Sequence, residues 1–358
     1  MTTSILVAFA IATQTTSLPD ISSEEKKQTV EALLKNLDES YVFPEKAKAA
    51  RDFIDKKVAN GAYNGISDPN KFAAELSRDV NSILADAHFR IRFSKSILPT
   101  REDNKEPSPA EIAEHKDMVR RQNAGIQKAE RFPGNIGYLE VNSFLGGAEI
   151  ARPAAAAFDF LADTDALILD LRRNGGGEPE AIRILCSYLF TEKPVHLNSI
   201  YWKPTNETTE FWTLDSLPAK RYIDKPVYVL TSKRTGSGAE ECAYNIQTQK
   251  RGKIVGEVTW GGANPGGGVR LNDHFMAFIP MGRAINPITK ANWEGVGVQP
   301  DVVTTSEAAL EQAQILALEE LIKGAKGDWK NALTERLAEI RKNKDAVIHL
   351  LRETAAGV

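Results

Sequence analysis

The segment Pro226–Tyr244 reads PVYVLTSKRTGSGAEECAY and carries the strongest indication of both fold and chemistry. Its apolar start, Val227–Leu230, is rich in β-branched and aromatic residues and predicts a buried strand, while Ala239–Gln249 predicts a helix. A glycine on each side of Ser237 lets the backbone turn sharply and lets another molecule approach the hydroxyl. A serine on such a strand–turn–helix lies beside outward-pointing helix N–H groups, which suits a nucleophile.

The same residues also have an interpretation without chemistry. The sequence from Ser237 to Glu240, SGAE, matches the capping box, in which the two side chains satisfy the first N–H groups of a helix. On this stretch alone, a capping serine is the more common explanation. The choice therefore depends on whether the rest of the chain supplies an oxyanion site and a base.

A second glycine turn follows another predicted strand. Ala166–Leu171 has a buried-strand pattern, and RRNGGG at 172–177 leads into a helical pattern at 178–190. Successive glycines after a strand can turn backbone N–H groups into a concavity that binds an anion. A phosphate loop is not indicated, because neither glycine-rich nucleotide motif occurs. Two interpretations stay open, an oxyanion hole and a plain βα loop.

A serine hydroxyl needs a base to take its proton, and the chain has five histidines. His88 lies where a helical pattern ends and an alternating strand, Phe89–Phe93, begins, and a residue at such a junction can project into a cleft. The other four lie in charged helical patterns or beside strand-like runs: His115, His349, His196 and His274. These patterns alone do not choose among the five.

Four motifs occur in order along the chain: DLRRNGGG at 170–177, TGSGAE at 235–240, VGEVTWGG at 255–262 and WEGVGVQPD at 293–301. Together they resemble the core of the tail-specific (C-terminal processing) serine peptidases, a family that includes the tricorn core protease and the repeats of interphotoreceptor retinoid-binding protein. Residues 33–89 are similar to the helical subdomain in the retinoid-binding-protein branch. The resemblance covers roughly residues 25–305. It implies a ββα-type core like that of crotonase and Clp peptidases.

The resemblance also implies roles for particular residues. Ser237 falls on the nucleophile of the family. Gly176 and Gly238 fall on the residues whose N–H groups form the oxyanion hole, the site that stabilises the negative charge of the reaction intermediate.

The residue that takes the serine proton is implied by a position where this chain differs from the tail-specific peptidases. Those enzymes activate serine with a lysine, and Gly262 occupies that position here, so a serine–lysine pair is not expected. His88 and Glu294 match instead the histidine and glutamate of tricorn-like members. A histidine is a suitable base at neutral pH, and a carboxylate can help to hold a partner in place.

The segment between the helical and core patterns is too short for the PDZ domain that tail-specific proteases carry there. About 40 residues separate Phe93 from Gly134, and they include a charged stretch, Glu111–Arg131, that predicts a solvated helix. We therefore expect a linker or lid at 95–133, and no PDZ domain that recognises the C-terminus of a substrate.

Composition argues against several function classes. The chain has 358 residues, a formal net charge of −3 and no basic patch interleaved with aromatics, so neither nucleic acid nor an anionic membrane is indicated. Cys186 and Cys242 fall in predicted core helices, and neither C-x-x-C nor H-E-x-x-H occurs. We therefore expect no disulfide framework, no metal site and no cofactor.

Strand–helix alternation from Ile136 onward predicts an α/β fold class for the catalytic core. The apolar run Ile5–Ala12 resembles a secretory signal and is too short for a membrane span of roughly 20 residues. It predicts a periplasmic or secreted protein, with a cytoplasmic one left open. Five parts are expected: a possible signal segment at 1–17, an N-terminal helical subdomain at 18–94, the linker or lid at 95–133, the α/β core at 134–325 and a C-terminal helix at 326–358.

The sequence thus predicts a tricorn-like serine peptidase that acts on peptides or unfolded proteins. Two alternatives stay open: a non-catalytic binder of a retinoid or fatty acid, and a structural or interaction protein that uses the C-terminal helix. A binder would need none of the serine, histidine, glutamate and glycines. If the peptidase prediction holds, Ser237 and His88 converge to within about 3–5 Å, and the Gly176 N–H points to the same place.

Overall fold

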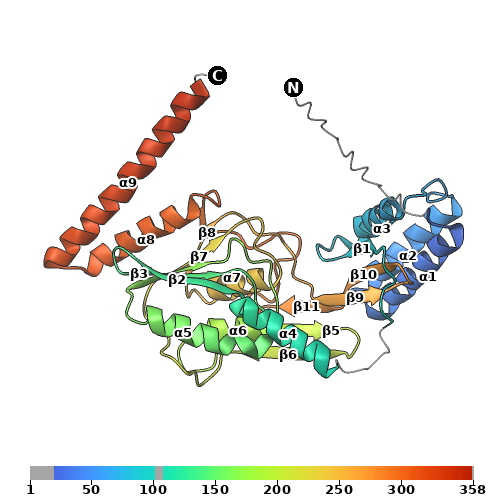
Figure 1. The fold of residues 1–358 in the computed structure, drawn as a ribbon, viewed down its shortest axis with the longest axis horizontal. Coiled ribbons are helices and arrows are strands. Elements are labelled where there is room, and N and C mark those ends of the chain that lie inside the picture. The colour runs from blue at the N-terminus through green and yellow to red at the C-terminus, as the bar shows by residue number, and fades with distance from the viewer. Residues whose placement is uncertain (1–19, 101–107, 357–358) are drawn as a thin grey trace, which may run out of the picture.

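The computed structural model describes residues 20–100 and 108–356, with side chains described as far as residue 342. Figure 1 shows a group of helices at one end and a larger body of strands and helices beside it. This mixed α/β architecture with an N-terminal helical region confirms the predicted fold class. The possible signal segment at 1–17 lies outside the described residues, so the periplasmic or secreted location stays a prediction.

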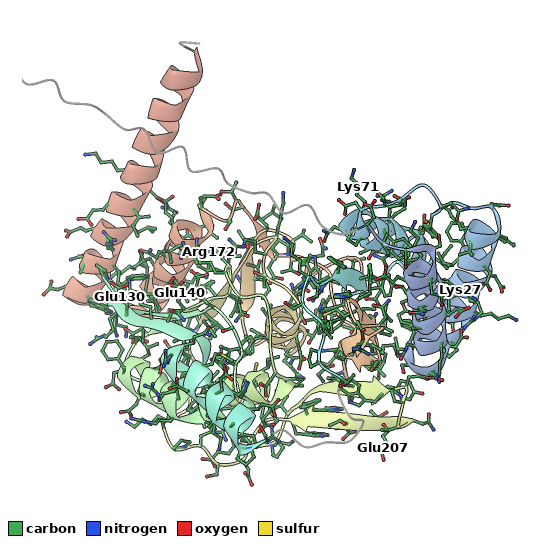
Figure 2. All side chains as sticks on the ribbon, turned by 45° about the vertical axis from the view of Figure 1, so that its right-hand side comes forward. Lys27, Lys71, Glu130, Glu140, Arg172 and Glu207 are labelled. Atoms are coloured by element: carbon green, nitrogen blue, oxygen red, sulfur yellow. The ribbon has the colours of Figure 1, made fainter. Side chains whose placement is uncertain are left out.

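The N-terminal region is built from three helices that begin where the sequence supplies a start signal. Ser22 forms a capping box, a proline opens the second helix, and the Asp68 carboxylate accepts hydrogen bonds from the first N–H groups of the third. Their outer faces carry charge, as Lys27 and Lys71 illustrate in Figure 2. The helices are α1 (Ser23–Ser40), α2 (Pro44–Ala59) and α3 (Pro69–Leu84).

A small antiparallel sheet joins these helices to the body. Its three strands, in spatial order, are β1 (Arg90–Phe93), β10 (Phe275–Pro280) and β9 (Gly266–Arg270). The apolar side chains of α1–α3 and of this sheet share one buried cluster. Phe72 from α3 meets the Phe275 ring edge-on, with centroids 5.7 Å apart. The chain after α3 is thereby fixed against residues nearly 200 positions later.

The body is organised around a six-stranded sheet that is parallel except for its edge strand β2. Every residue of its central strands β4 and β7 is buried, which is why both appear in the sequence as continuous apolar runs. In spatial order the strands are β12 (Val302–Val303), β8 (Lys253–Gly256), β7 (Val227–Thr231), β4 (Ala166–Asp170), β3 (Ile136–Val141) and β2 (Ile126–Phe132).

Helices cover both faces of this sheet. On one face a single core cluster includes α5 (Ala151–Leu161), α6 (Pro179–Ser187) and α7 (Gly238–Thr248). On the other face lie α8 (Ala309–Gly324) and the first part of α9 (Gly327–Ala356). Helix α9 lies within the segment 326–358 where the sequence predicts a C-terminal helix, and Figure 1 shows its far end pointing away from the body. None of the helices in the described part of the chain combines the length and apolar character needed to cross a membrane.

The helix predicted at Glu111–Arg131 is wrong in its second half. Helix α4 (Pro109–Arg121) ends early, and after a short turn, η1 (Asn123–Gly125), the chain forms β2. A side chain on Gly125 would strike the Ser143 carbonyl at 1.9 Å, so this turn packs directly on the body. The charges of β2 resemble a solvated helix because an edge strand exposes much of its surface. The segment at 95–133 is thus partly an edge of the sheet and not only a linker.

A second three-stranded sheet was not predicted as a unit. It contains β11 (Gly282–Ile285), β5 (His196–Trp202) and β6 (Glu207–Trp212). Glu207 marks the tip of the β5–β6 hairpin in Figure 2. The β6 residues are mostly exposed, so the strand carries no apolar run that would reveal it.

Truncating Phe72 should destabilise the joint between the helices and the small sheet. Its side chain is fully buried between Tyr63 and Phe275. We expect Phe72→Ala to lower the free energy of unfolding by about 3–5 kcal/mol, because it leaves a cavity. Phe160→Ala is the matched control, since Phe160 is 55% exposed, and it should cost under about 1 kcal/mol. Urea unfolding measures both, and equal losses would contradict the packing described.

Candidate active site

Ser237 occupies the turn between β7 and α7 in an unusual backbone conformation. Its φ of 51° and ψ of −121° lie outside the regions that non-glycine residues normally adopt. The surrounding hydrogen bonds hold this conformation: the Ser237 N–H donates to Glu240 Oε2 at 2.8 Å, and the Gly236 N–H donates to the Asn174 carbonyl at 3.1 Å. Backbone strain of this kind costs roughly 1–3 kcal/mol and is concentrated at functional sites.

His88 meets Ser237 from the N-terminal region. Its Nε2 lies 3.0 Å from Ser237 Oγ, within the predicted range. The imidazole is buried between two aromatic rings, edge-on to Trp260 and stacked on Phe278. Phe278 pairs with Arg90 in the β10–β1 ladder, so the small sheet brings the histidine to the serine.

Burial determines the charge state of this histidine. Desolvation, with a smaller contribution from the nearby Arg90 guanidinium, lowers the pKa of His88 to about 4. The imidazole is therefore neutral near pH 7 and has a lone pair available to accept a proton. The unprotonated ring is the form that a general base needs, while the lowered pKa makes this imidazole a weaker base than a free histidine side chain.

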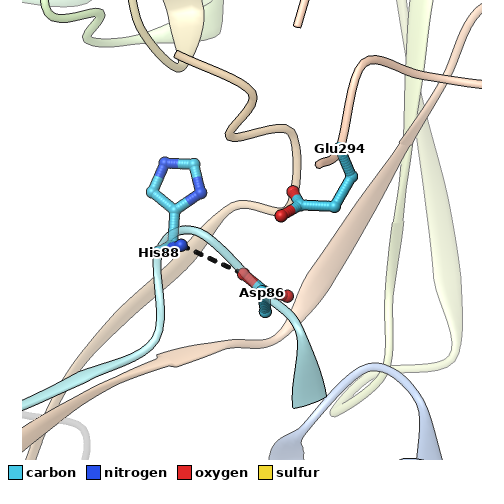
Figure 3. Close-up of side chains that lie close together, drawn as sticks. All are labelled: Asp86, His88 and Glu294. Carbon is cyan, nitrogen blue, oxygen red and sulfur yellow. Dashed lines mark hydrogen bonds between the residues drawn. The ribbon is translucent and has the colours of Figure 1, made fainter. Parts of the chain in front are cut away.

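Two carboxylates lie beside the imidazole. Donor atoms from Asp86, His88 and Glu294 are all within 4.8 Å of one another. Figure 3 shows a ring nitrogen of His88 facing the Glu294 carboxylate. Because Nε2 contacts Ser237, the nitrogen on that side is Nδ1, and no hydrogen-bond partner for it exists among the described residues. Glu294, predicted from its motif, is thus next to the histidine.

Backbone N–H groups hold the Glu294 carboxylate. Oε1 accepts from Ala87 at 2.8 Å, and Oε2 accepts from Ala263 at 2.6 Å and Asn264 at 3.2 Å. The first of these donors comes from the N-terminal region and the other two from the body. The carboxylate is therefore a fixed bridge between the two parts.

Asp86 is a site residue that the sequence did not reveal. It is almost fully buried and accepts hydrogen bonds from the His88 N–H, Asn264 Nδ2 and the Tyr41 hydroxyl. Burial is the largest cause that raises the pKa of Asp86, and the negative charge of Glu294 is the second. The three hydrogen bonds lower it, and the net result is a pKa of about 6. Asp86 lies within residues 33–89, which resemble the helical subdomain of the family, but only its contacts in the fold distinguish it from an ordinary turn aspartate.

The expected oxyanion donor at Gly176 is corrected by the structure. Its N–H donates to Asn174 Oδ1 at 2.8 Å, inside its own loop. Glycine is required there because the backbone has φ of +106° and a Cβ would lie 2.8 Å from the Ser237 Cβ. The next N–H, of Gly177, has no acceptor among the described residues and lies about 3 Å from where a Gly238 side chain would begin.

Gly262, at the position of the family lysine, is enclosed by aromatic rings. A Cβ on it would lie 2.4 Å from the Trp260 ring and 2.8 Å from His88 Cε1. The space that a lysine side chain would need is therefore occupied by the histidine and its neighbour.

Glu240 connects the serine turn to the Trp260 loop. Its carboxylate is fully buried and accepts from the Ser237 N–H, the Thr259 hydroxyl and the N–H groups of Gly261 and Gly262. Burial raises its pKa, while these hydrogen bonds act in the opposite direction. Glu240 thus caps the helix, as the SGAE pattern indicates, because its carboxylate accepts from the Ser237 N–H. The hydroxyl of Ser237 also contacts His88.

The other histidines in the described part of the chain lie away from the serine. His196 stacks on Trp212 and bonds to Ser199, and His274 bonds to the Ser94 carbonyl. His115 is exposed on α4. The side chain of His349 lies outside the described residues.

Replacing Glu240 should loosen the serine turn. In wild-type protein, N–H and O–H donors face both oxygens of the Glu240 carboxylate. Glu240→Gln replaces one oxygen with an NH₂ group that cannot accept, and each buried donor left without an acceptor costs about 1–3 kcal/mol of stability. We expect a clear fall in the thermal unfolding temperature. Glu207→Gln on the exposed β6 strand makes the same chemical change and should leave that temperature unchanged. An unchanged temperature in both variants would mean that the carboxylate does not hold the turn.

Comparisons with known proteins were made for the whole chain. A family profile described as "Peptidase family S41" matches residues 135–304. A second, described as "N-terminal domain of Peptidase_S41 in eukaryotic IRBP", matches residues 14–127. The two matches are separated by residues 128–134, which form most of β2 and the turn that leads into β3.

Two named relatives match part of the chain. The carboxyl-terminal-processing protease of Synechocystis sp. (strain ATCC 27184 / PCC 6803 / Kazusa) is 28% identical over 156 residues, 43% of this chain and 34% of the relative. The chloroplastic carboxyl-terminal-processing peptidase 2 of Arabidopsis thaliana is 29% identical over 167 residues, 46% of this chain and 31% of the relative. The chain spans about a third of the length of these relatives.

A solved structure supports the fold. A lipoprotein from Streptococcus agalactiae aligns with a TM-score of 0.53 at 17% identity, over 82% of this chain and 96% of that one. At this identity the likeness concerns the arrangement of helices and strands alone.

Proposed function

Because the chain belongs to peptidase family S41, we propose that it is a serine peptidase that hydrolyses peptide bonds of peptides or unfolded proteins. Ser237 is the nucleophile and His88 the base. The observation that carries this assignment is the 3.0 Å contact between Ser237 Oγ and His88 Nε2, made by a strained serine and a neutral, buried histidine.

The proposed reaction follows from these positions. Ser237 Oγ attacks the carbonyl carbon of the substrate while its proton moves to His88 Nε2. The oxyanion is stabilised by the N–H groups of Gly177 and Gly238, at the start of α7. His88 then gives the proton to the leaving amine, and water, activated by the same nitrogen, releases the acyl group.

The carboxylates have a supporting role in this proposal. The imidazolium that forms during the reaction would be costly in a buried site, as the lowered pKa of His88 indicates. Asp86 and Glu294 lie within 4.8 Å of the ring and offset this cost. The Nδ1–H of the histidine faces Glu294, so that carboxylate also favours the tautomer whose Nε2 can accept a proton.

Covalent labelling by a fluorophosphonate tests the nucleophile and the base. Wild-type protein should be labelled at Ser237, and Ser237→Ala should not react. His88→Ala should slow labelling by several orders of magnitude, on the order of the 10⁴–10⁶-fold losses seen when triad members are removed. Glu294→Gln should have a smaller effect, because it does not accept the serine proton. The labelling rate is measured on a gel, and casein hydrolysis should follow the same ranking.

Two controls separate this proposal from its alternatives. Lys233→Ala and Lys253→Ala should keep the wild-type labelling rate. Among the described residues, the hydrogen-bond partner of Ser237 Oγ is His88, and neither lysine contacts this hydroxyl. If either variant were inactive while His88→Ala was active, a lysine would be the base. If wild-type protein were not labelled but bound a retinoid or fatty acid tightly, the binder would be the better description.

A lysine placed at residue 262 should not restore the serine–lysine chemistry of the wider family. Gly262→Lys forces its Cβ against Trp260 and His88, so the histidine must move away from Ser237 and labelling should fall to background. Gly267→Lys adds the same side chain on β9 where a Cβ meets nothing within 4 Å, and it should be labelled like the wild type. Labelling of Gly262→Lys that survives the additional change His88→Ala would contradict this expectation.

A further inference from the structure

We propose that Asp86, His88 and Glu294 form a binding site for Zn²⁺, and that the bound ion switches off the base. The inhibitory half of this inference depends on the proposed function, whereas the binding half does not. The site is not visible in the sequence, because the three residues have none of the local spacings of known zinc motifs.

The donor set and its spacing suit zinc. Imidazole nitrogen and carboxylate oxygen are both zinc ligands, with bonds of about 2.0–2.2 Å that put tetrahedral donors roughly 3.4 Å apart. The three donor atoms lie within 4.8 Å of one another, so shifts on the order of 1 Å bring them to that spacing. Figure 3 shows all three side chains directed at a common space, which leaves the fourth position for water.

An unpaired buried nitrogen points to the ligand. His88 is 7% exposed, and its Nδ1 has no hydrogen-bond partner among the described residues. Buried polar atoms normally have a partner, so an orphan beside two carboxylates needs an explanation. A second orphan, Asn264 Oδ1, belongs to the side chain whose Nδ2 donates to Asp86. It can accept a hydrogen bond from a water on the metal.

Outer partners already orient the ligands. The Glu294 carboxylate is held by three backbone N–H groups, and Asp86 is held by the His88 N–H, Asn264 and Tyr41. Each carboxylate oxygen has two lone pairs, so these bonds leave room for a metal. Such outer hydrogen bonds are typical of metal sites, where they fix ligand orientation and raise affinity.

The charges around the site favour a divalent cation of the zinc type. Two carboxylates contribute negative charge, and among the described residues the positive charge that acts on His88 comes from Arg90, whose Nη1 lies 3.5 Å from the His88 carbonyl. An imidazole ligand suits zinc, whereas magnesium and calcium prefer oxygen donors only. We therefore expect selectivity for Zn²⁺ over Mg²⁺.

Occupancy changes the tautomer of the histidine. In the active tautomer the ring proton is on Nδ1 and the Nε2 lone pair faces Ser237. A metal ion binds Nδ1 through the electron pair that holds the Nδ1 proton, so this proton is released to solvent, and Nε2 takes up a proton on its own lone pair. The ring stays neutral, but Nε2 now donates to the serine oxygen and cannot accept its proton. Zinc thus blocks the base without touching Ser237.

Calorimetric titration of the full chain with ZnCl₂ tests the binding half. We expect one zinc ion per chain at this site, no binding of MgCl₂, and unchanged binding in Ser237→Ala. His88→Ala and Glu294→Gln should each weaken binding by at least the 10–100-fold that loss of an outer partner costs. His115→Ala removes an exposed histidine and should bind like the wild type. If His88→Ala bound zinc as tightly as the wild type, or if the wild type bound none, the site would be refuted.

The fluorophosphonate labelling rate tests the inhibitory half. Zinc should slow labelling of the wild type, and a chelator should restore it. If zinc bound to the wild type but did not slow its labelling, the inhibitory half would be overturned and the binding half would stand. If the wild type were labelled but bound no zinc, the site would be refuted and the peptidase proposal would stand. Should a ligand variant fail to fold, zinc-edge anomalous diffraction from zinc-soaked Ser237→Ala crystals locates the ion directly. An ion elsewhere would refute the site.

Discussion

The antiparallel pairing of β1 with β10 is the constraint on which the site depends. It joins the strand that directly follows His88 to a strand beyond Ser237 in the sequence, and it places the imidazole against Phe278 of the same ladder. Without it, the helical region would have its own packed helices but no fixed position relative to the body. The hydrogen bonds of Glu294 and Asp86 cross the same boundary, so the contacts that join the two parts are also those that orient the base.

A second constraint lies within the body and holds the nucleophile. The buried Glu240 carboxylate binds both the N–H of Ser237 and the loop that carries Trp260 and Gly262. A residue that the sequence marks as an ordinary helix cap therefore stabilises a strained turn and shapes its surroundings. Helix capping is compatible with the proposed role of Ser237, because the Glu240 carboxylate accepts from the helix N-terminus while the serine hydroxyl contacts the histidine.

Much of the fold could be predicted because its central strands are buried on both faces. The runs that became β4 and β7 are apolar throughout, and the glycines after each mark the turns of the site. Edge strands gave no such pattern: β2 carries charges and was taken for a helix, and β6 was missed. Ser237, His88 and Glu294 were proposed from motifs, and the structure places their side chains close together. Asp86 and the proposed use of the Gly177 N–H in place of that of Gly176 could not be predicted, because they depend on which N–H groups the folded loops already use.

The separation of the reactive groups along the chain has a consequence for the timing of activity. His88 and Ser237 are 149 residues apart, and the Ala87–Glu294 contact spans 207 residues. During synthesis the histidine is made early and has no nucleophile to act on, and the serine appears before the glutamate that stabilises its partner. A nascent, truncated or partly melted chain therefore lacks the assembled candidate site. For the peptidase proposed above, completion of the native fold would be the activation step, and the cell would be protected from the enzyme during its synthesis.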